Sequence, residues 1–302
     1  MATFKSWLYA ARLRTLPLSI SGIVVGTAMA HAMGFTNFGI LILSLLTTVA
    51  FQVTSNFAND YGDGVRGTDN ELRIGPKRAL QSGMLSQSAL KNGIFVSSVI
   101  SILLAIALIY SAFGLDKIPY AVFFLVLGAL SIWAAIRYTV GQSAYGYRGL
   151  GDLFVFLFFG LVSVLGSFFL YVGHFKTAAV FPAISIGLLS VGVLNLNNLR
   201  DVDSDKIHGK NTLIVKMGFE RGKVYHAILV VIAFISFIVY GMVEILPWQG
   251  FMYLLAFVPI FMHLRRVLTI KQPSQMDPEL KKLALSTFLS SVLFYISINY
   301  FF

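Results

Sequence analysis

The sequence predicts an all-α membrane protein with nine transmembrane helices. Its 302 residues are 57% hydrophobic and only 12% charged, and the mean hydropathy is +0.79. A soluble domain carries about 25% charged residues. Half that share, together with repeated apolar stretches of about 20 residues, is typical of helices that cross a lipid bilayer.

The apolar stretches define the order of the predicted helices. They cover residues 16–33, 37–57, 92–113, 118–137, 152–173, 177–197, 224–242, 248–265 and 283–301. Gly and Pro occur inside several of them, as transmembrane helices tolerate. The first stretch has no clear cleavage site, so we expect it to stay in the protein as a helix.

The charged residues predict the orientation in the membrane. With the N-terminus in the cytoplasm, every Lys and Arg except Lys117 and Lys176 falls on the cytoplasmic side. Cytoplasmic loops carry this excess in membrane proteins. We therefore expect a cytoplasmic N-terminus, an external C-terminus and chemistry at the cytoplasmic face. The net charge of +10 is then explained by contact with anionic lipid headgroups rather than with nucleic acid.

Composition also excludes some kinds of site. The chain has no cysteine, so disulfides, thiolate metal sites and cysteine nucleophiles are ruled out. The five histidines are scattered without an H-E-x-x-H pair, which makes a zinc site improbable.

Two acidic motifs follow even-numbered helices, the second and the sixth. NFANDYGDGVRGTDNE (56–71) contains Asn56-x-x-x-Asp60-x-x-Asp63, and LNLNNLRDVDSDKIHGKNTL (194–213) contains Asn198-x-x-Asp201-x-x-x-Asp205. Four predicted helices separate them. The simplest interpretation is two pseudo-repeated four-helix units plus a ninth helix, arranged around a central cavity that opens to the cytoplasmic face.

The spacing within each motif predicts a site for a hard cation. Steps of three and four residues place polar side chains on one helical face. Two such faces would bring several oxygen ligands together, and a cation must relieve the repulsion between the carboxylates. Mg²⁺ suits such ligands and completes its shell with water and phosphate. The predicted metal ligands are Asn56, Asp60, Asp63, Asn198, Asp201 and Asp205, and the four aspartates are also the predicted catalytic residues. Asp69 is a further candidate or a solvated loop acid.

Basic residues beside the motifs indicate a diphosphate. Acids that hold a metal, interleaved with cations that neutralise the remaining phosphate oxygens, are typical of a diphosphate site. The predicted diphosphate-binding residues are Arg66, Arg73, Arg78, Arg200 and Arg148. Each of them has the alternative of a lipid headgroup contact. A single such motif is usually a solvated helix end, but two in equivalent positions favour a site.

With these motifs, the chain resembles the UbiA superfamily of intramembrane aromatic prenyltransferases. Within it, the stretches NDYGDGVRGTD (59–69), RIGPKRALQSG (73–83), YGYRGLGDLFVFLFFG (145–160) and ARLRTLPLS (11–19) are similar to the 1,4-dihydroxy-2-naphthoate polyprenyltransferases of menaquinone synthesis. Where the family often reads YTGGP, this chain has Tyr138-Thr139-Val140-Gly141-Gln142. This difference concerns the part of the site that would bind the aromatic substrate, the prenyl acceptor.

The resemblance implies a reaction and further roles. A polyprenyl chain would pass from polyprenyl diphosphate to 1,4-dihydroxy-2-naphthoate, with loss of CO2 and diphosphate, to give demethylmenaquinone. One transmembrane domain (1–302) would carry cytoplasmic active-site loops at about 58–91 and 198–223. Asp152 would orient or deprotonate the acceptor hydroxyl, or be only a helix N-terminal charge. Arg137, Tyr138 and Tyr147 would bind the acceptor, although Arg137 also suits the membrane boundary.

Two alternatives stay open at this stage. A related enzyme for another aromatic acceptor, such as 4-hydroxybenzoate, would have the same motifs. A cation-coupled membrane transporter would also have repeated halves and acidic residues, although transporter sites lie near the middle of the bilayer. A purely structural membrane protein would leave the paired motifs unexplained.

Overall fold

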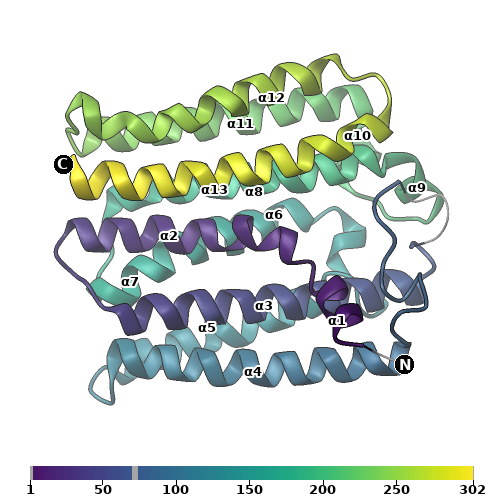
Figure 1. The fold of residues 1–302 in the computed structure, drawn as a ribbon, viewed down its shortest axis with the longest axis horizontal. Helices are drawn as coiled ribbons and strands as arrows, with labels where there is room; N and C mark the ends of the chain where they lie inside the picture. Colours follow the sequence, from purple (N-terminus) through teal and green to yellow (C-terminus); the bar gives the residue numbers. More distant parts are fainter. Residues whose placement is uncertain (1–2, 70–73, 302) are drawn as a thin grey trace.

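The computed structural model describes residues 3–69 and 74–301, which form helices and connecting turns without a strand among them. Within this part, nine segments are long and apolar enough to cross a membrane. Figure 1 shows the long helices lying side by side, with the two termini at opposite ends of the bundle. The predicted all-α class and the nine spans are confirmed, and the chain is an integral membrane protein.

The helices agree with the predicted order and differ at their ends. They are α1 (Phe4–Ala11), α2 (Leu16–Ala32), α3 (Phe38–Val65), α4 (Gln87–Phe113), α5 (Ile118–Arg137), α6 (Gly151–Val155), a π-helical segment (Phe156–Gly166), α7 (Ser167–Val172), α8 (Val180–Arg200), α9 (Val202–Ile207), α10 (Leu213–Met217), α11 (Phe219–Val243), a 3₁₀ segment (Trp248–Ala256), α12 (Phe257–Thr269) and α13 (Asp277–Tyr300). Together, α6, the π-helical segment and α7 form one span.

Local sequence explains several helix starts. Asn37, Ser86 and Thr212 precede α3, α4 and α10, and each side chain accepts a hydrogen bond from a backbone N–H in the first turn. Such caps satisfy donors that the helix itself leaves unpaired. Pro17 and Pro119 stand in the first turns of α2 and α5, where proline costs no hydrogen bond.

The predicted boundaries around the polar loops are wrong in two places. The second stretch was expected to end at residue 57, but α3 continues to Val65, so part of the predicted loop 58–91 is helical. The predicted loop 198–223 begins inside α8 and contains α9 and α10. Polar side chains can remain helical there because neighbouring segments satisfy them, as the next section describes.

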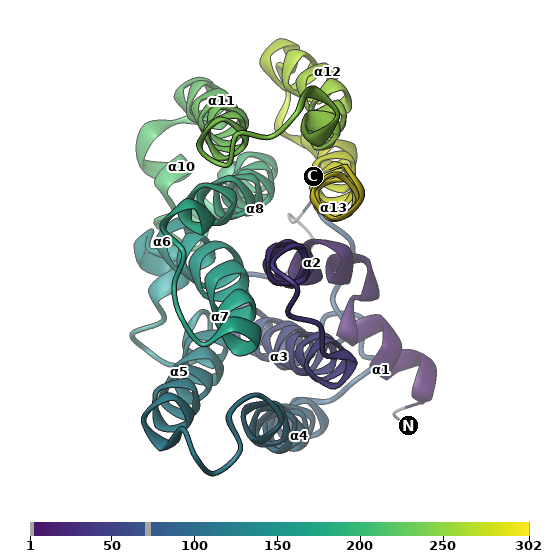
Figure 2. The ribbon, with the colours of Figure 1, turned by 90° about the vertical axis from the view of Figure 1, so that its left-hand side faces the viewer.

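Small residues bring the middle helices close together. Figure 2 shows α4 and α5 at one edge of the bundle and α11 and α12 at the opposite edge, with α2, α3, α7 and α8 between them. A Cβ added to Gly26 of α2 would lie 1.9 Å from the Ser167 hydroxyl, and one added to Gly160 would lie 2.6 Å from the Cα of Gly187. Contacts between small residues are the usual means of helix association in membranes.

Candidate functional site

The first acidic motif lies on the last turns of α3 and is buried. Asn56, Asp60 and Asp63 are exposed by 2%, 1% and 4%. Spacings of four and three residues put them along one side of the helix. The structure therefore brings these predicted residues together on one element, as the pattern indicated.

Two members of the motif hold neighbouring segments in place. The side-chain amide of Asn56 donates to the Ala11 carbonyl (2.8 Å), which ties α3 to the end of α1. Both carboxylate oxygens of Asp60 accept backbone hydrogen bonds, from the N–H groups of Ala79 (3.0 Å) and Leu80 (3.1 Å). These contacts hold α1 and the segment around residue 80 against α3, and the role of Asn56 and Asp60 as metal ligands stays a prediction.

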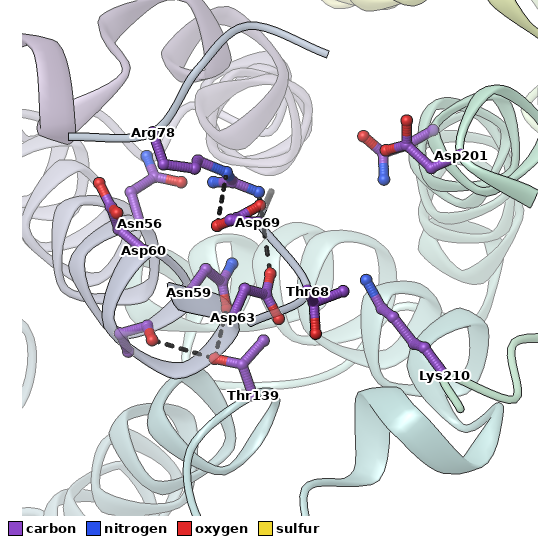
Figure 3. Close-up of polar contacts among 12 residues, drawn as sticks. Asn56, Asn59, Asp60, Asp63, Thr68, Asp69, Arg78, Thr139, Asp201 and Lys210 are labelled. Atoms are coloured by element: carbon purple, nitrogen blue, oxygen red, sulfur yellow. Dashed lines mark hydrogen bonds and ion pairs between the residues drawn. The ribbon is translucent and has the colours of Figure 1, made fainter. Parts of the chain in front are cut away.

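Asp63 is the centre of the first half of the site. Its Oδ1 accepts a hydrogen bond of 2.8 Å from the Tyr147 hydroxyl, which is also 2.6 Å from the Thr68 hydroxyl. Arg78 lies 3.9 Å from Asp63 and 3.5 Å from Asp69. Figure 3 shows Asp63, Thr68 and Asp69 together below Arg78. This arrangement gives Asp69 a partner and makes it part of the cluster.

Two glycines allow other segments to reach the motif helix. A Cβ on Gly62 would lie 2.5 Å from Oγ1 of Thr139, and one on Gly64 would lie 2.5 Å from Cδ2 of Leu80. Thr139 is fully buried and donates to the Ala58 carbonyl of α3 at 3.0 Å. The glycines of NDYGDG therefore admit the segment that follows α5 and the one around residue 80.

The second motif lies at the end of α8 and is also buried. Arg200 donates to both carboxylate oxygens of Asp201 (2.8 and 2.6 Å) and to Asp277 at the start of α13 (2.6 Å). An arginine held by two carboxylates is a structural clamp. The structure places Arg200 between α8 and α13, and its predicted role in binding diphosphate stays a prediction.

Lys210 links the two halves of the site. It is 7% exposed, and its ammonium lies 3.7 Å from Oδ1 of Asp205 and 5.6 Å from the centre of the Tyr147 ring. Burial lowers the pKa of Lys210, but the carboxylates of Asp63 and Asp205 outweigh burial and raise it. The side chain therefore stays charged at every physiological pH. In Figure 3 it reaches toward Thr68 and Asp63, with Asp201 on its own side of the site.

The segments that carry the two halves are also joined by hydrogen bonds to the backbone carbonyls of residues 147 and 148. The N–H of Asn211 donates to the Tyr147 carbonyl (3.1 Å), and the Lys216 ammonium donates to the Arg148 carbonyl (3.2 Å). Segment 145–148 therefore lies between the first motif and the segment that follows the second.

The side chains of the two motifs offer carboxylate and amide oxygens, which are the ligands that a hard cation prefers. Among the described residues, no group of three or more His, Asp or Glu side chains lies close enough to hold a metal ion without further ligands, and the joint metal site of the two motifs stays a prediction. Two buried atoms without a hydrogen-bond partner are Oδ1 of Asn198, an acceptor, and Nη1 of Arg78, a donor. The Asn198 oxygen can bind a cation or its water, and the Arg78 nitrogen can donate to a phosphate oxygen. Both therefore suit a metal diphosphate.

Several predicted residues lie at the edge of this cluster or outside it. The guanidinium of Arg66 is exposed, lies 4.1 Å from the centre of the Tyr147 ring and donates to the Gly141 carbonyl. Arg148 is exposed, and Arg137 folds over Gly141 of its own turn. Arg73 lies outside the described residues.

Asp152 lies in the first turn of α6, and Tyr138 directly follows α5. Asp152 is buried and accepts a hydrogen bond of 3.0 Å from the Tyr225 hydroxyl of α11. Burial raises the pKa of Tyr138 to about 12; the nearby Lys210 acts in the opposite direction and Asp63 adds to the increase. Tyr138 is therefore a neutral phenol at physiological pH.

An apolar cavity adjoins this end of the bundle. Its volume is about 340 Å³, and it is lined by α2, α3, α4, α5 and the span from α6 to α7. Asn59 and Tyr138 line it near the acidic cluster, and Leu108, Phe124 and Leu170 line it far from the cluster. The arrangement offers a polar head site and a dry compartment for a long apolar tail.

Sequence reasoning missed four kinds of contact. It named Lys210 only as a basic residue that follows the second motif, and it did not include this lysine among the diphosphate-binding residues. It did not assign Thr139 or Tyr225, which have no local pattern. It also missed a buried hydrogen-bonded chain through His226 and His263, whose positions in the sequence are 37 residues apart.

Comparison with known proteins identifies relatives of this chain. The sequence model of the UbiA prenyltransferase family matches residues 19–292. A 1,4-dihydroxy-2-naphthoate octaprenyltransferase of Haemophilus influenzae is 40% identical over 293 residues, which cover 96% of this chain and 94% of the relative. The protein of the same name from Escherichia coli is 39% identical and covers 97% and 95%.

Solved structures share the fold. A UbiA homologue from Aeropyrum pernix has a TM-score of 0.67 at 17% identity, covering 95% of this chain and 98% of that one. A homologue from Archaeoglobus fulgidus, described as bound to DMAPP and Mg²⁺, has a TM-score of 0.60 at 14% identity and covers 93% and 98%. With the family match spanning nearly the whole chain and close relatives aligned from end to end, this protein belongs to the UbiA prenyltransferase family.

Proposed function

We propose that this protein transfers a polyprenyl chain from polyprenyl diphosphate to 1,4-dihydroxy-2-naphthoate, releasing CO2 and diphosphate and forming demethylmenaquinol, the two-electron-reduced form of demethylmenaquinone. The observation that carries the proposal is the polar cluster of two acidic motifs, with the unpartnered Arg78 Nη1 and Asn198 Oδ1, beside an apolar cavity. Relatives that are 39–40% identical over nearly their whole length bear the name of this activity.

The polar and apolar parts of the prenyl diphosphate would bind in the polar cluster and in the apolar cavity, respectively. The diphosphate would lie between the motifs, where Arg78 and Lys210 provide buried positive charge. The prenyl chain would lie in the apolar cavity, which excludes water from the reacting carbon. Acidic residues at one end of the bundle, rather than midway along it, favour this enzyme over a transporter.

In the reaction, the bond between C1 of the prenyl chain and the diphosphate oxygen breaks, and the diphosphate keeps the electron pair. Arg78 and Lys210 stabilise the charge that develops on the leaving group. The ring carbon that bears the carboxylate then bonds to C1, and the carboxylate leaves as CO2 while its electron pair restores the aromatic ring. Tyr138, a neutral phenol at the cavity wall, presents an aromatic face to the allyl cation.

Mg²⁺ fits this site and would add positive charge to the diphosphate when bound. Asp63, Asn198, Asp201 and Asp205 would hold it. Asp60 and Asn56 would support it from the scaffold, and Arg66 and Arg73 would contact the outer phosphate oxygens. The protein would lie in the bacterial inner membrane, with the site facing the cytoplasm.

The acceptor would bind on the side of Asp152. This carboxylate, held by Tyr225, would accept the hydrogen bond of a ring hydroxyl. The hydroxyl of Tyr147 is already bonded to Asp63 and Thr68, so its proposed role is to orient Asp63 rather than to bind the acceptor.

One assay tests the proposal. Purified protein with Mg²⁺, a polyprenyl diphosphate and carboxyl-labelled 1,4-dihydroxy-2-naphthoate should release labelled CO2 and diphosphate in equal amounts. Prenylation of 4-hydroxybenzoate with its carboxylate retained, and no reaction of dihydroxynaphthoate, would show that the acceptor is wrong. No diphosphate release with any acceptor would refute the proposed activity.

A further inference from the structure

A chain of buried hydrogen-bonding side chains crosses the C-terminal half of the bundle and has no part in the reaction above. Nδ1 of His226 lies 3.1 Å from Oδ1 of Asn195, and the Nε2 atoms of His226 and His263 lie 3.0 Å apart. Nδ1 of His263 lies 2.7 Å from Oε2 of Glu279. The chain thus connects α8, α11, α12 and α13.

All four side chains are hidden inside membrane-spanning segments. None of them is more than 3% exposed. Ionisable groups in such segments are costly and are usually kept for a function. An apolar core would hold four helices together equally well. The polar chain therefore calls for a reason beyond packing.

The chain ends beside the second acidic motif. Asn195 precedes Asn198 by one turn of α8, and Arg200 follows Asn198 by two residues. Arg200 bonds to Asp277, and the chain from Asn195 ends at Glu279, so both connections reach the first turn of α13. The first turn of α13 therefore holds α8 at two points that flank Asn198.

These two connections between α13 and α8 affect the predicted metal ligand Asn198. Its Oδ1 is buried and has no hydrogen-bond partner, so no hydrogen bond of its own fixes the direction of this atom. The rotation of α8 sets the direction in which the side chain leaves the helix. Partners that orient a ligand without touching the metal commonly change metal affinity by about 10- to 100-fold.

We propose that the chain Asn195–His226–His263–Glu279 is a positioning device that sets the rotation of α8 and so aims Asn198 at the metal diphosphate. The inference rests on the proposed function, because it takes Asn198 as part of that site. His226, His263 and Glu279 are positioning residues that act through α8.

Two substitutions of His263 separate this role from simple packing. In His263→Asn the amide nitrogen takes the place of Nδ1, so Glu279 keeps its donor while the link to His226 is cut. In His263→Gln the amide takes the place of Nε2, so the link to His226 stays while Glu279 loses its donor. Lys282→Met is the matched control, since it removes only the 58% exposed partner of Glu279 and leaves the chain intact.

The readout is binding of Mn²⁺ in the presence of a non-hydrolysable prenyl diphosphate analogue, followed by electron paramagnetic resonance on the purified protein. We expect about tenfold weaker Mn²⁺ binding in both His263 variants and wild-type binding in Lys282→Met. Wild-type affinity in His263→Asn, with only thermal stability lowered in His263→Gln, would overturn the inference. If His263→Asn does not accumulate as folded protein, Asn195→Leu cuts the same chain at α8, and wild-type affinity there has the same meaning. Absence of Mn²⁺ binding in the wild type would instead count against the proposed function.

Discussion

Tyr147 donates a hydrogen bond of 2.8 Å to Oδ1 of Asp63, which joins the segment after α5 to the first acidic motif. Tyr147→Phe keeps the ring beside Arg66 and Lys210 but removes this bond. A hydrogen bond to a charged group contributes about 1.5–3 kcal/mol, so we expect kcat to fall by about tenfold or more. Steady-state kinetics test this. Tyr145→Phe, whose hydroxyl donates to the Ala134 carbonyl, is the control and should keep most of its activity.

Lys210 and Lys206 form a natural pair for testing the buried charge. Lys210 is buried against Asp205, whereas Lys206 is exposed in the same segment. Removing one partner of a buried charge pair leaves the other uncompensated. Lys210→Met should raise the KM for prenyl diphosphate by about tenfold or more, and Lys206→Met should leave it unchanged. Equal effects of the two substitutions would mean that burial of Lys210 has no role in binding.

The aspartates of the two motifs should be essential for different reasons. Asp60→Ala frees the backbone N–H groups of Ala79 and Leu80, next to Arg78, and Asp201→Ala removes one of the two carboxylates that hold Arg200. We expect both variants to lose turnover while they still insert into membranes. Asp203→Ala, which changes an exposed acid between Asp201 and Asp205, should be normal. Normal turnover in the Asp60 or Asp201 variant would refute the shared site.

Gly62 is predicted to be intolerant of any side chain. A Cβ there would lie 2.5 to 2.8 Å from three atoms of Thr139, one of them backbone. Overpacking of this kind costs about 1–3 kcal/mol. Gly62→Ala should therefore lower the midpoint of thermal unfolding in detergent and also reduce activity. Gly128→Ala is the control, because its nearest neighbour would lie 3.9 Å away, and an equal loss of stability there would contradict the explanation.

The apolar cavity predicts selectivity for the prenyl chain. Ser131 lines the cavity, whereas Leu130 is 49% exposed on the outer face of α5. Ser131→Phe should fill the middle of the cavity and reduce kcat/KM for a long prenyl diphosphate more than for geranyl diphosphate. Competition between the two substrates measures this ratio. Leu130→Phe should leave the ratio unchanged, and an unchanged ratio in Ser131→Phe would show that the chain binds elsewhere.

Hydropathy was sufficient to predict the number and order of the membrane helices, because each one must satisfy its backbone within the bilayer. It failed at the end of α3, where the run Asp60 to Gly64 looks like a loop. That run is helical because its acids find partners on Tyr147, Ala79 and Leu80, which lie far away in the sequence. Tertiary contacts of this kind leave no trace in local composition. The proposed repeat of two four-helix units stays a prediction.

The paired motifs predict a joint site, but they do not indicate which neighbour each side chain contacts. Arg200 has the same appearance in sequence as Arg78, yet one clamps Asp201 and Asp277 while the other borders Asp63. The difference depends on α13, whose Asp277 is 77 positions away from Arg200. Spacing along a helix gives the face of a side chain, and the partner opposite that face comes only from the fold.

The joining of segment 145–148 to Asn211 has a consequence for how the protein is made. The first motif is synthesised and inserted well before the second, and the Lys210 charge arrives only after the sixth span. Until then the growing chain holds Asp63 and Tyr147 without their opposite half. A chain that ends before residue 198 therefore lacks both the second acidic motif and the buried charge that faces Asp63.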